Sequence, residues 1–187
     1  MSDYSIGELS RQIANLIRVG EVSETDFTDP DAPRVKVAVS GFESDWLPFG
    51  AERAGHTKTW SPLSIGEQVL ILSPYGDLGQ AVIVCSLYSE SNPAPSSGGN
   101  VEKTVFHDGT TISYDSVSHT MSANIGGTTI TADRGQIALG VGGVTFVITD
   151  GGLDIQGGQV THNGKNIGSD HAHSGIQRGS ANSDGPI

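Results

Sequence analysis

The sequence lacks the features of a disulfide-stabilised, membrane-spanning or nucleic-acid-binding protein. It contains one cysteine, so no internal disulfide can form. No apolar run approaches the roughly 20 residues that a membrane-spanning helix needs. The polar N-terminus also leads us to expect no secretory signal. Only 10 lysines and arginines stand against 21 acidic residues, and the resulting net charge of −11 opposes binding to nucleic acid.

Hydrophobic and aromatic residues are scarce as well, at 35% and 6% of the chain. This shortage predicts either a partly disordered chain or a hydrophobic core that one chain cannot complete. The single cysteine, Cys85, ends the apolar run Ala81–Cys85. Because free cysteine packs like a small hydrophobic residue, we expect Cys85 to be buried.

Proline is missing between Pro95 and Pro186, whereas 18 of the 26 glycines lie from Gly98 onward. The change of composition falls at residues 89–100, a segment rich in serine, proline and glycine. Such a segment is typical of a linker. The sequence therefore predicts two domains with different architectures on either side of it.

The first half combines one helical pattern with several short strands. Apolar residues recur at helical spacing over Ile6–Val19, and we assign residues 1–14 to an N-terminal helical segment. Five short strands within residues 15–88 predict a small closed barrel such as an OB-fold. The clearest strand patterns are Arg34–Val39, Ser44–Phe49, Glu67–Leu72 and Gln80–Cys85.

The second half shows no helical periodicity and alternates apolar with polar residues, which is typical of strands. Threonine dominates the polar positions and suits a strand because its side chain is β-branched. The alternation changes phase at Gly142–Gly143. The apolar positions are Val105, Ile112, Tyr114, Met121, Ala123, Ile125, Ile137, Leu139, Val141, Val144, Phe146, Ile148, Leu153 and Ile155.

Each of these strands offers only two or three apolar residues on one face, which is too little for an independent core. Wrapping several identical chains around one axis would cover the strand edges and join the thin apolar faces. An intertwined triple-stranded β-helix fits this pattern over residues 101–168. A single-chain β-sandwich fits the composition equally well.

Two histidines near the C-terminus, His171 and His173, are candidate metal ligands. On an extended segment, residues two apart project to the same side. In one chain the pair is an incomplete site, and two solvated histidines in a tail are the simpler interpretation. In a three-fold trimer the pair becomes six nitrogen donors, a set that suits an octahedral ion such as iron or nickel.

An ordered set of motifs resembles a known family. Leu16–Gly20, Asp45–Pro48, Gly66–Leu70 and Gly76–Ala81, followed by the C-terminal histidine pair, resemble phage baseplate assembly protein V. This is the central spike of contractile tails, to which R-type pyocin spikes are similar. The resemblance covers nearly the whole chain.

The resemblance implies a mainly β homotrimer with an OB-fold collar, a triple-stranded β-helix and an apex at residues 169–187. At that apex, His171 and His173 of three chains would hold one iron ion. It further implies a virion protein that contacts the tail tube and baseplate hub. Such a spike pierces the bacterial outer membrane mechanically and catalyses nothing.

Two other functions fit parts of the pattern. A trimeric tail fibre or receptor-binding protein would share the β-helical shaft, but its tip usually carries exposed aromatic residues. A β-helical polysaccharide-degrading enzyme would need two carboxylates in one cleft. The carboxylates beyond the linker are scattered, and Asp108, Asp150 and Asp184 each precede a glycine, as in turns.

Overall fold

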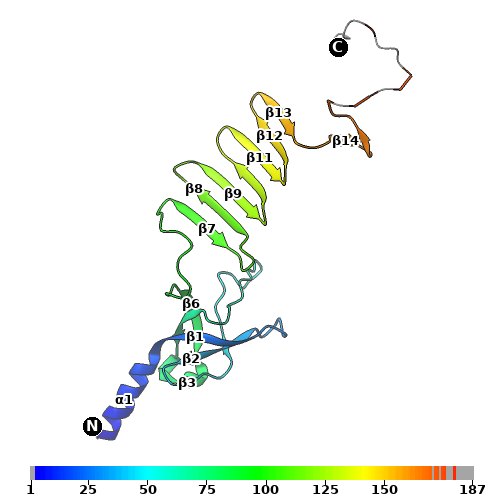
Figure 1. Cartoon of the computed structure of the whole chain (residues 1–187). Helices are drawn as coiled ribbons and strands as arrows, with labels where there is room; N and C mark the ends of the chain where they lie inside the picture. Colours follow the sequence, from blue (N-terminus) through cyan, green and yellow to red (C-terminus); the bar gives the residue numbers. More distant parts are fainter. Residues whose placement is uncertain (1–2, 170, 173, 176–178, 180–187) are drawn as a thin grey trace. The chain divides into compact units, whose positions relative to one another are not determined.

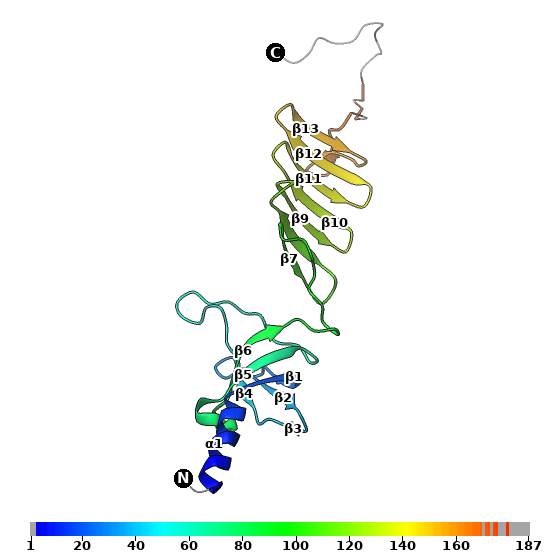
Figure 2. The same ribbon diagram turned by 90° about the vertical axis from the view of Figure 1, so that its left-hand side faces the viewer.

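The structure is a computed structural model that describes residues 3–169, 171–172, 174–175 and 179. Figures 1 and 2 show its elements from two sides. The chain divides into two compact units, Met1–Ala94 and Pro95–Ile187. We refer to them as unit 1 and unit 2. No helix in the described part of the chain is long and apolar enough to cross a membrane.

Unit 1 is a helix followed by a small β-barrel. Its central sheet has the strand order β3-β2-β1-β5-β6, and β4 pairs with β2. A parallel bridge between Phe49 and Ile83 joins the end of β4 to β6, so the sheet closes on itself. The elements are α1 (Asp3–Leu16), β1 (Ile17–Asp26), β2 (Arg34–Val39), β3 (Phe42–Glu43), β4 (Leu47–Pro48), β5 (Gln68–Leu72), η1 (Pro74–Gly76), η2 (Leu78–Gln80) and β6 (Val82–Leu87).

The barrel interior holds the hydrophobic core. Strand β2 shows the underlying pattern, since Val35, Val37 and Val39 are buried while the residues between them are more exposed. This alternation is the period-two pattern that the sequence shows over Arg34–Val39. The buried hydrophobic residues are Val22, Val35, Val37, Val39, Leu47, Val69, Ile71, Ala81 and Ile83.

The N-terminal helix is confirmed, but it ends earlier than the apolar spacing predicts. Helix α1 stops at Leu16, and Ile17 opens β1 instead of continuing the helix to Val19. Ile17 pairs with Leu72 of β5, and Val19 pairs with Leu70. Ile17 fits the helical spacing of the preceding apolar residues, but its pairing in this sheet makes it a strand residue.

The expectation that Cys85 is buried is wrong, because the residue is exposed. Its neighbour two positions earlier, Ile83, is buried and faces the barrel interior. The register between β5 and β6 shifts between Leu70 and Ile71, so Cys85 lies opposite Leu70 while Ile83 lies opposite Ile71. This bulge reverses the alternation within β6 and turns Cys85 outward.

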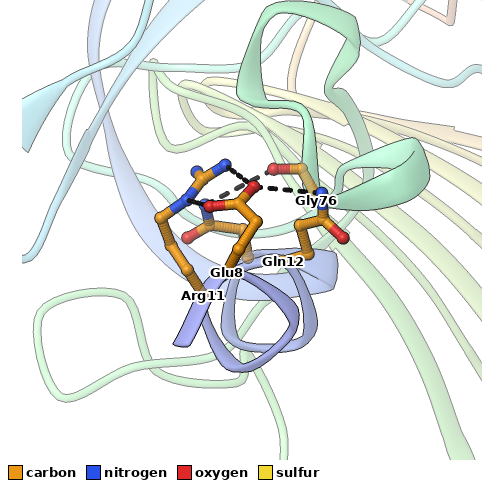
Figure 3. Close-up of polar contacts among 5 residues, drawn as sticks. Glu8, Arg11, Gln12 and Gly76 are labelled. Atoms are coloured by element: carbon orange, nitrogen blue, oxygen red, sulfur yellow. Dashed lines mark hydrogen bonds and ion pairs between the residues drawn. The ribbon is translucent and has the colours of Figure 1, made fainter. Parts of the chain in front are cut away.

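The polar side of helix α1 faces the turn η1 of the barrel (Figure 3). The buried Asn15 donates a hydrogen bond from Nδ2 to the carbonyl oxygen of Gly76, at 3.4 Å. Its Oδ1 accepts a hydrogen bond of 2.6 Å from the guanidinium of Arg18. Glu8 accepts hydrogen bonds from Arg11 and Gln12 along the same side of the helix. The turn η1 therefore packs on the polar side of α1.

Unit 2 is an antiparallel meander in which each strand pairs with the next along the chain. Its sheet has seven strands in the order β13-β12-β11-β10-β9-β8-β7, and a separate hairpin of β14 and β15 follows. The strands are β7 (Val101–Val105), β8 (Thr111–Asp115), β9 (Thr120–Ile125), β10 (Thr128–Ala132), β11 (Gln136–Val141), β12 (Val144–Thr149), β13 (Gly152–Gln156), β14 (Thr161–His162) and β15 (Lys165–Asn166).

Residues 101–156 form one sheet and not the two packed layers of a single-chain β-sandwich. The buried hydrophobic residues among the described part of the chain all lie between Val22 and Ile83, within unit 1. The described residues of unit 2 therefore contain no hydrophobic core of their own.

Candidate assembly face and tip

Apolar residues form two continuous rows across the sheet of unit 2. Within each row, neighbouring residues are direct cross-strand partners, an arrangement that places their Cβ atoms roughly 4.5–5.5 Å apart. The first apolar row is Ile112, Ala123, Ile130, Leu139, Phe146 and Ile155. The second apolar row is Tyr114, Met121, Ala132, Ile137, Ile148 and Leu153.

Both rows lie on the same face of the sheet. In each strand the members of the two rows are two residues apart, as Leu139 and Ile137 are in β11, and side chains two apart in a strand share a face. The opposite face, which we call the hydroxyl face, carries mostly serine and threonine in β8–β10, and Ala138 and Val147 are apolar exceptions in β11 and β12. There Ser113 and Ser122 are cross-strand partners whose hydroxyl oxygens lie 2.9 Å apart. We call the side with the two rows the apolar face.

The apolar face is open in the single chain. Apart from the half-buried Phe146, its large side chains range in exposure from 36% at Ile155 to 56% at Leu153. Isolated exposed hydrophobic residues are common, but a contiguous apolar surface that extends over several strands marks an interaction site. The face runs from β8 to β13, because each row has a member in every one of these strands.

Several carboxylates of unit 2 stabilise the turns that connect its strands. Asp108 accepts a hydrogen bond of 2.9 Å from the backbone N–H of Thr110, and Asp115 accepts one of 2.8 Å from the N–H of Val117. These backbone hydrogen bonds hold the pKa of each carboxyl below its usual value. Neither group has the raised pKa that a general acid needs.

At the C-terminal end of the described chain, a backbone carbonyl orients His171. The backbone N–H of His171 donates to the carbonyl oxygen of Gly168 at 3.2 Å, and its Nδ1 lies 2.6 Å from the same oxygen. Because a carbonyl oxygen only accepts, Nδ1 must carry the proton of the neutral ring, and Nε2 carries the lone pair. The imidazole is exposed.

The second predicted ligand, His173, lies outside the described residues, so the geometry of the pair stays a prediction. Among the residues that the structure does describe, no group of three or more histidines, cysteines or carboxylates gathers in a single chain. His162 in β14 contacts Asn163 through Nε2 at 3.2 Å.

The apolar positions predicted from sequence in β8, β9 and β11–β13 lie on the apolar face, and the central member of each row was missed. Ile130 and Ala132 belong to β10, where threonines occupy three of the five positions. The only signal for this strand was its β-branched composition between Gly127 and Gly135.

Comparison with known proteins bears on both units. Residues 18–88 match the family described as the Type VI secretion system/phage-baseplate injector OB domain. Residues 18–88 therefore form an OB domain. The chain is also 40% identical over 111 residues to the spike protein of Escherichia phage P2, an alignment covering 59% of this chain and 51% of the phage protein. The chain thus spans about half the length of that relative. The resemblance to baseplate spikes is confirmed.

Proposed function

We propose that this chain is the central spike of a contractile-tail baseplate, in a virion or a tail-like particle. Three copies form a triple-stranded β-helix in which the seven-stranded sheets of the copies pack around one axis. This shaft is driven through the bacterial outer membrane when the sheath contracts. The apolar face of unit 2 carries this proposal, because its two rows leave every strand from β8 to β13 with uncovered hydrophobic side chains. The similarity to the P2 spike protein and to injector OB domains supports it.

Identical copies are the simplest cover for the apolar face. Each copy presents the same two rows, so three sheets arranged around one axis bury their rows against one another and leave the hydroxyl faces in water. Burial of apolar surface contributes about 25 cal/mol per Å², and the energy is gained only in the assembly. A shaft of this kind resists bending, because its core and its ladders of strands run along the whole length.

The work of the spike is mechanical. In this proposal the OB domain attaches the trimer to the tail tube and baseplate hub, and the shaft transmits the thrust. No chemistry is required of the side chains, which agrees with carboxylates such as Asp108 and Asp115 being engaged in turns. We therefore assign no catalytic residue.

A metal ion at the tip would tie the three chain ends together. His171 and His173 of each copy would supply six imidazole nitrogens, a set that suits octahedral iron. The orientation of His171 fits this role, because its contact with Gly168 places the lone pair on Nε2. Termini fray readily, so cross-linking them there would contribute folding energy at the weakest point of the shaft.

The first test is the solution mass of the full chain, measured by light scattering. A mass of about 58 kDa, three times the 19.4 kDa of one chain, would support the spike. A stable monomer of 19.4 kDa would overturn it. Electron microscopy of particles carrying a labelled chain then separates a spike from a tail fibre. Label on the axis of the baseplate supports the spike, and label at its periphery contradicts it.

A further inference from the structure

Helix α1 carries an apolar stripe that the described residues of its own chain leave exposed. The stripe consists of Ile6, Leu9, Ile13 and Leu16, whose exposed fractions are 52%, 51%, 58% and 39%. We propose that α1 is a self-association element, in which the helices of the copies pack in parallel as a short bundle. This inference rests on the proposed function for the number of copies but uses a separate surface.

The spacing of the stripe is that of a coiled-coil seam. Its members are separated by three, four and three residues, so isoleucine occupies both a positions of two heptads and leucine both d positions. Parallel helices in register bring identical a and d residues face to face, which makes the stripe complementary to itself. Isoleucine at a with leucine at d favours two strands in a free coiled coil, but two heptads are too short to impose that number on tethered chains.

The stripe points away from the barrel of unit 1 because the polar side of α1 is already engaged. Glu8, Gln12 and Asn15 lie about a third of a turn from the stripe, at 100° per residue. That polar side contacts η1, where a β-carbon on Gly76 would approach the Cα of Gln12 to 2.6 Å. Asn15, on the same side, is only 4% exposed. The OB domain thus holds the helix with its apolar stripe outward.

The residues that flank the seam would not repel a second copy. Within α1 the e and g positions beside the stripe hold Ser5, Ser10 and Gln12, none of which is charged. The charged residue Asp3 lies at an e position before the stripe begins. Like charges at these positions would disfavour a parallel bundle of identical helices. The charged residues Glu8 and Arg11 lie at c and f and pair with each other at 2.7 Å. From Ile6 to Leu16, therefore, no like charges flank the stripe that would oppose self-association.

The small size of the stripe also favours a second copy over an unrelated protein. A specific interface between free proteins usually buries more than about 1,000 Å², and helices of 12–15 residues are marginal when isolated. Four side chains on a helix of 14 residues fall short of that. Copies that a shaft already holds together meet at high effective concentration and need much less surface.

Apolar surface continues along the chain beyond the stripe. Ile17 is 63% exposed and pairs with Leu72, which in turn pairs with Val82. These three residues form an exposed cross-strand row on the outside of the barrel, with Leu72 and Val82 at 37% and 38%. The helix stripe and this row together give unit 1 an uncovered apolar surface independent of the shaft.

Disulfide trapping in the full chain tests the inference. The single native cysteine is first removed as Cys85→Ser, and Leu9→Cys and Ile13→Cys then place thiols on the seam. Ala14→Cys is the matched control, because Ala14 is also exposed but lies at a b position outside the seam. Under mild oxidation we expect both seam variants to form disulfide-linked pairs, up to about two thirds of the chains in a trimer, and the control to form few.

Light scattering on the same samples separates the two possible failures. Seam variants that cross-link no more than Ala14→Cys while the protein remains a trimer would overturn the helix bundle and leave the proposed function standing. A monomeric mass would overturn the proposed function, and the bundle with it. Using two seam variants guards against one of them failing to fold, because cross-linking of either folded variant above the control supports the inference.

Discussion

Gly76 lies so close to helix α1 that a β-carbon there would come within 2.6 Å of the Cα of Gln12. Gly76 also has a φ of +70°, in the left-handed region that favours glycine. Both constraints arise where η1 meets the helix. Gly76 therefore determines whether α1 can dock on the barrel in the orientation that exposes its apolar stripe.

We expect Gly76→Ala to weaken the docking of α1. The left-handed backbone and the clash with Gln12 should together cost about 1–3 kcal/mol. Trypsin should then cleave faster at Arg11, and the free energy of unfolding of the chain should fall. Gly79→Ala is the control in the same connection, because its β-carbon would meet only the carboxylate of Asp77, at 3.3 Å. Equal proteolysis of the two variants would contradict the role of Gly76.

A new charge should prevent trimer formation when it is placed in the first apolar row and should have no effect on the opposite face. Leu139 lies opposite Phe146 on the apolar face, whereas the nearby Thr145 lies on the hydroxyl face. Leu139→Asp would place a charge in the core of the trimer, where an unpaired charge costs several kcal/mol. We expect loss of the trimeric mass in light scattering.

Thr145→Asp introduces the same charge one strand away and should leave the trimeric mass unchanged. Thr145 is exposed and pairs with Gly140 and Gln156, so the new carboxylate would stay in water. Trimer formation by Leu139→Asp, or its loss in Thr145→Asp alone, would mean that the chains do not meet through the apolar face.

The turn after β8 predicts a dependence of stability on pH. Asp115 accepts backbone hydrogen bonds from Val117 and Ser118, at 2.8 and 3.3 Å, and these bonds lower its pKa. A lowered folded-state pKa adds stability above the unfolded value of about 3.9. That contribution is lost as the pH falls through the lowered pKa.

Asp115→Asn isolates this effect, because an amide oxygen can accept the same hydrogen bonds but does not titrate. We expect the wild-type chain to be more stable than Asp115→Asn at pH 7 and the difference to be smaller at pH 2. Unfolding in guanidinium chloride at the two pH values measures it. A difference that is independent of pH would show that the charge of Asp115 contributes nothing.

Sequence patterning predicts most of this fold because most of its strands have a regular period of two. The alternation around Leu139 and Phe146 identifies the apolar face before any pairing is known. Sequence patterning gives the wrong local structure where tertiary contacts determine it. A bulge between β5 and β6 reverses the orientation of Cys85, and sheet pairing ends the helix before Ile17. Strand β10 was missed because its one large apolar residue, Ile130, shows no alternation by itself.

The tip was predictable only in part, for a related reason. A histidine pair in one chain does not by itself indicate a metal site, because the number of ligands depends on how many copies of the chain contribute. The structure adds the contact of His171 Nδ1 with Gly168, a local feature that no sequence spacing reveals. It does not describe His173, so the proposed ligand set must be tested by chemistry.

Metal analysis of the purified full chain provides that test. We expect one iron ion per three chains in the wild type and none in the double variant His171→Ala, His173→Ala. Because the ion would join three chain ends, its loss should also lower the midpoint of thermal unfolding. The control is His107→Ala, which removes a histidine from the turn between β7 and β8 and should retain the iron. Iron content that is unchanged in the double variant would place the metal elsewhere. A wild-type protein that binds no octahedral metal, even when iron is supplied during folding, would leave the tip to be stabilised by packing alone.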